Sequence, residues 1–215
     1  MLAAESLGGS HESYFYRGHQ WALAIDAATR TSLEIIRSAS GGRQGSLLAA
    51  IDRTVTSAGA RELAARLASP LRDPKVIGAR LDAVAYLFER VALREDLRSA
   101  LRSAPDIARA VSRLALQRGG PTDLAAVRDG LAAATTLSAL IEGSAGVIGL
   151  PHELSAIHAH LSAPGLSDLA RQLHAALIES PPPHRRDGGF VRPGFRTDLD
   201  DARQLKDDSR RVMTG

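Results

Sequence analysis

Several side chains are of types that could bind metal ions. The chain has seven histidines and no cysteine, so any metal ligands would be imidazoles and carboxylates. To bind one metal ion from the same helix face, two histidines must be three or four residues apart. In this chain His158 lies two residues from His160 and six from His152. We interpret the histidines as surface residues and predict no metal ligand.

The sequence also lacks the residue patterns that nucleophilic catalysis and nucleotide binding require. Ser144 lies between Gly143 and Gly146 without the Gly-x-Ser-x-Gly spacing of a nucleophile elbow. A phosphate-binding loop needs a lysine between glycine and serine or threonine, and neither Lys75 nor Lys206 follows a glycine. We therefore predict no catalytic residue, no cofactor-binding residue and no enzymatic activity for this chain.

Two groups of charged residues have a binding interpretation and a structural one. An acidic cluster could hold two metal ions, but basic residues three or four positions away favour a solvated, ion-paired helix; the acids are Asp198, Asp200, Asp201, Asp207 and Asp208. Four arginines at every fourth position would form a basic ridge about 18 Å long. That ridge could contact phosphates, although nearby acids favour a solvated face; its members are Arg90, Arg94, Arg98 and Arg102.

The composition favours closely packed helices and does not demand a nucleic-acid partner. Hydrophobic residues make up 44% of the 215 residues but aromatic residues only 4%, with a net charge of +3. No apolar run approaches the roughly 20 residues of a membrane span, and the first residues lack the apolar block of a signal peptide. We therefore expect a cytoplasmic protein with no membrane association.

Hydrophobic periodicity and capping residues predict a mainly α fold. Residues 1–21 form an irregular lead-in, and residues 22–36 contain two short apolar runs, 22–25 and 33–36, that favour a small pair of strands or a strand-turn-helix edge. Thr56 is expected to cap a helix that stops before Pro70, and Asp73 is expected to cap the next helix. The apolar stripe of that second helix would be buried; it consists of Ile77, Leu81, Val84, Leu87 and Phe88. Further helices are predicted over 93–104, 107–118, 124–143 after a cap at Thr122-Asp123, 154–161, 166–178 and 197–212, with a non-helical ribbon over 185–195.

Four patches, in order, resemble one known family. The longest comprises Ile51, Asp52, Thr54, Thr56, Gly59, Arg61, Leu63, Pro70, Leu71, Ile77, Arg80 and Val84. The others are Ile25-Asp26 with Thr29 and Leu33-Glu34-Ile35, Arg113-Leu114-Ala115-Leu116 with Pro121-Thr122-Asp123-Leu124, and Asp187-Gly188-Gly189 with Gly194-Phe195 and Leu199-Asp200 to Arg203. These resemble the core, or lever, domain of the MutS family of DNA mismatch-repair proteins.

The resemblance implies that residues 22–215 are the first part of a lever domain, truncated before the clamp domain. The intact parent would be a homodimer that binds mismatched duplex DNA, uses ATP and Mg, and engages a MutL-type downstream partner. The family's mismatch-sensing Phe-x-Glu element is absent here, because no phenylalanine is followed at the second position by glutamate. The lever would transmit conformational state between clamp and ATPase. Two alternatives stay open, namely a free-standing helical adaptor for protein partners and an autonomous basic DNA-binding module.

Overall fold

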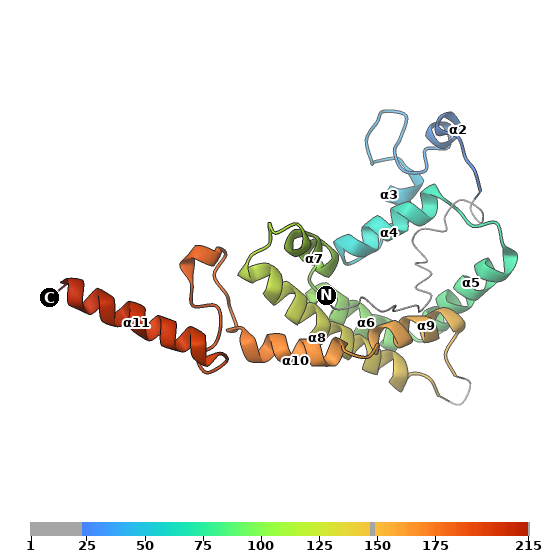
Figure 1. Ribbon diagram of the computed structural model, residues 1–215. Helices are drawn as coiled ribbons and strands as arrows, with labels where there is room; N and C mark the ends of the chain where they lie inside the picture. The colour runs from blue at the N-terminus through green and yellow to red at the C-terminus, as the bar shows by residue number, and fades with distance from the viewer. Residues whose placement is uncertain (1–22, 147–148, 215) are drawn as a thin grey trace, which may run out of the picture. The chain divides into compact units, whose positions relative to one another are not determined.

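The computed structural model describes residues 23–146 and 149–214 (Figure 1). Helices joined by loops make up this part of the chain, which contains no strand. The prediction of a mainly α fold is therefore confirmed. The chain divides into two compact units, one ending at Asp82 and the other starting at Ala83. The predicted lead-in, residues 1–21, lies outside the described residues.

Side-chain caps begin the helices of the first unit, which are α2 (Ala27–Ser32), α3 (Leu47–Ile51) and α4 (Ser57–Ala68). In each case a side-chain oxygen of the preceding residue accepts a hydrogen bond from a backbone amide three residues later. These caps satisfy amides that have no partner within the helix. The predicted cap at Thr56 is confirmed, and α4 ends two residues before Pro70.

The pair of strands expected within residues 22–36 is not formed over residues 23–36; position 22 lies outside the described residues. Asp26 instead caps α2, and the chain turns after it, with Glu34 at a φ of +48°. The backbone groups of the two runs pair with other segments, because Leu23 donates to the Pro70 carbonyl at 2.8 Å and Ile35 accepts from Leu48 at 2.9 Å. The cap at Asp26 and these longer-range bonds compete successfully with a local ladder.

Helix α5 (Pro74–Glu89) starts as predicted but buries a different face from the expected one. The Asp73 carboxylate accepts from the Lys75 amide at 2.8 Å at its start. Its predicted buried stripe is wrong at three positions, since Leu81, Val84 and Phe88 are 61%, 62% and 74% exposed. The neighbouring face packs instead, through the small side chain of Ala83 and through Tyr86, whose hydroxyl donates to the Ser144 carbonyl at 2.5 Å; both side chains are buried.

In the second unit, one central helix organises the packing. The helices are α6 (Val91–Ser103), α7 (Ile107–Ala115), α8 (Pro121–Gly143), α9 (His152–Leu161), α10 (Leu166–Ala176) and α11 (Thr197–Thr214). Helices α6, α7, α9 and α10 all pack against α8 (Figure 1). Two buried clusters result, one of Ala83, Tyr86, Leu97, Ile141 and Leu154 and one of Ala110, Val127 and Leu131.

The central helix begins earlier than predicted. Gly120 occupies the N-cap and Pro121 the first turn, where its missing amide costs nothing. Asp123 is therefore inside the helix, and its carboxylate accepts from the Gly120 amide at 2.9 Å. Gly130 lies in the middle of α8 because a Cβ there would come within 2.2 Å of Ile107 Cγ1. The glycine lets α7 approach closely.

Within the described residues, α8 has the length and mean hydropathy that a membrane span requires, which the sequence analysis did not anticipate. Four helices pack on it, and it carries the buried polar side chains of Asp123, Arg128 and Ser138. Its position at the centre of a helical unit accounts for its apolar composition without a bilayer.

Candidate functional site: a cross-linked junction before the last helix

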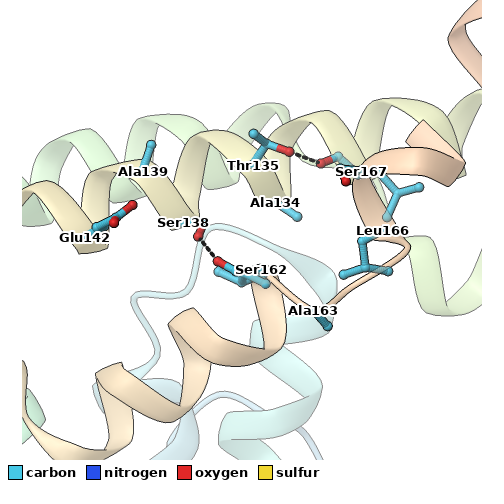
Figure 2. Close-up of a pocket in the computed structure, with 11 residues that line it drawn as sticks. Ala134, Thr135, Ser138, Ala139, Glu142, Ser162, Ala163, Leu166 and Ser167 are labelled. Carbon is cyan, nitrogen blue, oxygen red and sulfur yellow. Dashed lines mark hydrogen bonds between the residues drawn. The ribbon is translucent and has the colours of Figure 1, made fainter. Parts of the chain in front are cut away.

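One of the histidines considered as a possible metal ligand serves to join two helices. The residues described contain no group of three histidine, aspartate or glutamate side chains placed to hold a metal ion. His158 Nδ1 on α9 lies 3.0 Å from Ser138 Oγ on α8, and Ser138 Oγ lies 2.7 Å from Ser162 Oγ (Figure 2). Ser138 is buried, so these contacts satisfy its hydroxyl and connect α8 to α9.

A hollow of about 310 Å³ lies beside this contact, between α8 and the turn from α9 to α10. Figure 2 draws the residues that line it. Glu142 is the one carboxylate in its lining, and its side chain is exposed. The hydroxyl of Ser138 is bonded to His158 and Ser162 and not to Glu142, so this carboxylate is not placed to act on it as a base. The arrangement is a packing contact. Sequence reasoning missed Ser138 because its partners are 20 and 24 residues away.

The charged clusters are also internally paired. Arg196 Nε donates to Asp198 at 2.9 Å, and this hydrogen bond is the main reason that the pKa of Asp198 lies below its ordinary value. Asp200 pairs with Arg203 at 2.9 Å. The side chain of Asp207 lies outside the described residues. The solvated, ion-paired interpretation therefore holds where these pairs are seen.

Two arginines of the predicted basic ridge are used by α5. The Arg90 guanidinium lies 3.7 Å from the centre of the Tyr86 ring. Arg94 donates to the carbonyls of Leu87 and Phe88 at 3.2 and 3.0 Å. Positive charge on these last carbonyls stabilises the carboxyl end of α5. These two side chains thus have a structural role within the protein.

A buried arginine connects α8 to the segment after α10. Only 8% of Arg128 is exposed. Its Nη1 donates to the Ile178 carbonyl at 2.7 Å and its Nη2 to the Glu179 carbonyl at 2.9 Å, while Nε donates to Asp129 at 2.7 Å. A guanidinium offers a rigid fork of donors, so Arg128 fixes both carbonyls at once.

The segment held by Arg128 pairs with the predicted ribbon. The ribbon begins with a short 3-10 turn (Arg185–Asp187) and is otherwise non-helical up to Arg196. Leu177 and Val191 form an antiparallel bridge, in which the Ile178 amide donates to the Phe190 carbonyl at 3.0 Å. Arg192 strengthens it, because its backbone amide donates to Ala176 at 2.7 Å and its side chain to Leu177 at 2.6 Å.

The ribbon is in turn bonded to the first turns of α11. Arg203 Nη2 donates to the Val191 carbonyl at 2.9 Å, and its Nη1 pairs with Asp200. The other oxygen of Asp200 accepts from the Gly194 amide at 2.6 Å. We call the set of Arg128, residues 176–179, residues 190–194, Asp200 and Arg203 the junction. It connects the central helix to the start of α11, which leads away from α10 (Figure 1) and whose Leu205 is 69% exposed.

A second contact secures the turn between α7 and α8. Arg113 Nε donates to the buried carboxylate of Asp123 at 2.8 Å, and Arg185 donates to the Gly119 carbonyl at 2.8 Å. A Cβ on Gly119 would lie within 2.9 Å of the Leu114 Cα, so the turn requires glycine. The hydrogen bond from Arg113 is the largest reason that the pKa of Asp123 lies below its ordinary value.

This pKa shift predicts a pH dependence of stability. A carboxyl group whose pKa is lower in the folded state stabilises the protein above its unfolded pKa, and the contribution is lost as the pH falls through the folded value. We expect Asp123→Asn to lower the urea midpoint at pH 7, and the difference from the unmodified chain to be smaller at pH 3. Asp201→Asn, at an exposed position of α11, is the control and should change neither midpoint. An equal loss for Asp123→Asn at both pH values would contradict this prediction.

These features define the class of protein. The described residues are helical, buried polar contacts join the helices, and the last helix starts from a cross-linked junction. A profile of the family described as MutS domain III matches residues 28–212, and the chain belongs to this family.

Similar proteins agree with this assignment. Each of the three that follow is named DNA mismatch repair protein MutS. The protein of Ruegeria pomeroyi is 50% identical over 193 residues, which is 90% of this chain and 21% of the relative. The protein of Nitrobacter winogradskyi is 52% identical over 89% of this chain and 21% of its own length. That of Rhodopseudomonas palustris is 52% identical over 89% of this chain and 20% of its own length. The chain thus spans about a fifth of the relatives that it matches.

Proposed function

We propose that residues 22–215 are the first part of the lever domain of a longer DNA mismatch-repair protein. Its role is to transmit conformational state between the part that holds mismatched DNA and the part that hydrolyses ATP. ATP and Mg binding, catalysis and base recognition belong to other parts of that cytoplasmic protein, which acts as a homodimer and engages a MutL-type partner. The family membership and the junction support this proposal.

The observation that carries the proposal is the unbroken set of bonds from α8 to α11. Energetic coupling over long distances is transmitted by packed elements and hydrogen-bond networks with discrete arrangements. A rotation of α11 would strain the bonds that Arg203 makes to Val191 and Asp200. The ribbon would pass that strain through the bridge to the carbonyls that Arg128 holds on α8.

Arg203→Met tests this role in a full-length protein that contains the chain. Methionine keeps much of the aliphatic stem of Arg203. It removes the hydrogen bond to Val191 in the ribbon and the ion pair with Asp200. We expect mismatch binding without nucleotide to change little, and ATP-triggered release from a mismatch to slow about tenfold, as a coupling loss of about 1.4 kcal/mol would cause. Stopped-flow fluorescence of a labelled mismatched duplex measures the release.

The matched control is Arg171→Met, because Arg171 is 79% exposed on α10 and, among the described residues, its ion pair is with nearby Asp168. It should release DNA at the normal rate. Normal release by Arg203→Met, with the protein shown to be folded by circular dichroism, would refute the proposed transmission through the junction.

A further inference from the structure

The unit that ends at Asp82 contains a hollow that the proposed function does not use. Its volume is about 550 Å³. Its lining combines aliphatic side chains with three arginines and contains no acidic residue; the members that matter here are Ile36, Leu48, Ala64, Arg37, Arg43 and Arg61. We call it the arginine hollow. Such a lining suits a ligand that is apolar at one point and anionic at others.

Local hydrogen bonds fix the backbone of the turn between two of the three arginines. Arg37 and Arg43 flank a turn that is closed by bonds of 2.8 Å from the Ser38 amide to the Gly42 carbonyl and from the Gly41 amide to the Ser38 carbonyl. Gly41 has a φ of +82°, a conformation that other residues rarely adopt. The third arginine, Arg61, belongs to α4. The rim of the hollow is therefore built on a closed turn and a helix.

The charge on this rim is only partly compensated. Arg43 pairs with Asp52. Arg37 is exposed, and its guanidinium makes neither a hydrogen bond nor an ion pair with any described residue. Residues 23–82 contain nine lysines and arginines against six aspartates and glutamates. The unit that contains the hollow thus carries an excess of positive charge, which attracts an acidic ligand.

Uncovered aliphatic residues of the same unit indicate an extended contact. Leu33, Leu47 and Ile51 are 59%, 46% and 44% exposed. These three side chains lie outside the lining and add exposed apolar surface to the unit, which is available to another protein segment. The lining has no aromatic side chain on which a base could stack, and its aliphatic members offer nothing to a phosphate backbone. A peptide fits this lining better than a nucleic acid does.

We propose that the arginine hollow receives a segment of the same full-length polypeptide, outside residues 1–215, in which carboxylates flank an aliphatic side chain. Arginine pairs with carboxylates through two parallel hydrogen bonds, and the aliphatic side chain lies against Ile36 and Leu48. The chain spans about 21% of its relatives, so most of the parent lies outside it, and a tethered segment has a high effective concentration. The inference rests on the proposed function, because it requires the chain to be part of a longer protein.

Carbodiimide cross-linking of Arg37→Lys in the full-length protein tests the proposal. Lysine keeps the positive charge and supplies the amine that the reagent joins to a touching carboxylate; Lys75 and Lys206 are the chain's own lysines. Arg72→Lys, an exposed position of the same unit outside the lining, is the matched control. We expect mass spectrometry to find a cross-link from position 37 to an aspartate or glutamate beyond residues 1–215, about tenfold above the control, as a tethered ligand would give.

Three outcomes would overturn the proposal. They are a yield at position 37 no higher than at position 72, cross-links confined to residues 1–215, and cross-links to a different polypeptide, which mixing with isotope-labelled protein reveals. Loss of the cross-link in the Arg37→Lys, Arg61→Gln double variant would support a role for the second arginine of the rim. Slow DNA release by Arg203→Met without a cross-link at position 37 would refute the hollow's role and leave the lever function intact.

Discussion

Replacing Arg128 with methionine is expected to lower the free energy of unfolding of the second unit by about 3 kcal/mol. The variant leaves the carbonyls of Ile178 and Glu179 without their donors, and hydrogen bonds from a charged group are worth about 1.5 to 3 kcal/mol each. Methionine occupies a similar volume, so the loss reports the bonds more than a cavity. Hydrogen exchange of α8 and α10 amides as a function of urea measures it for this unit alone.

Two companion variants make the Arg128 result specific. Arg171→Met removes an arginine that is 79% exposed, and its expected cost is below about 0.5 kcal/mol. Arg128→Lys keeps the charge but cannot reach both carbonyls in one fixed geometry, so its loss should lie between the other two. A loss for Arg128→Met no larger than that for Arg171→Met would show that the junction adds nothing to stability.

The second large effect is expected in the core. Ile141 on α8 is 4% exposed and belongs to the cluster formed with Tyr86, Leu97 and Leu154. Ile141→Ala removes buried methylene groups and leaves a cavity that close packing prevents from collapsing, so we expect a loss of about 3 to 4 kcal/mol. Urea denaturation followed by circular dichroism measures it, together with the exchange of α8 amides.

Ile157→Ala is the matched control for this cavity. Ile157 lies on α9 and is 44% exposed, so truncation there exposes little new surface and should cost less than about 1 kcal/mol. Losses of equal size at positions 141 and 157 would contradict the assignment of the core to the cluster around Ile141.

Local chemistry allowed the prediction of most helices. Thr56 and Asp73 bond to amides within a few residues, and Pro70 lies just after the end of α4, so these signals depend on near neighbours alone. The resemblance to the MutS family could also be recognised from the sequence, because the residues that carry it occur in a fixed order along the chain. The strands expected within residues 22–36 failed because the carbonyl of Ile35 pairs with Leu48, a partner that no local pattern contains.

Helix α5 shows the limit of periodicity. Its apolar residues predict a buried face, but Val84 and Phe88 are exposed and Ala83 and Tyr86 are buried. A period of 3.6 residues identifies an amphipathic helix without naming the surface that the rest of the fold covers. The neighbours of a helix, and not its own stripe, decide which side is buried.

The sequence by itself determined the approximate extent of most helices, the mainly α class, and the family, because each depends on residue types at short or ordered spacings. The tertiary structure alone decided the junction and the arginine hollow. Arg128 meets its carbonyl partners 50 and 51 residues away, and Arg37 shares a lining with residues of α4. Such contacts form only when the chain returns on itself, since their bonds depend on distance in space and not on distance along the chain.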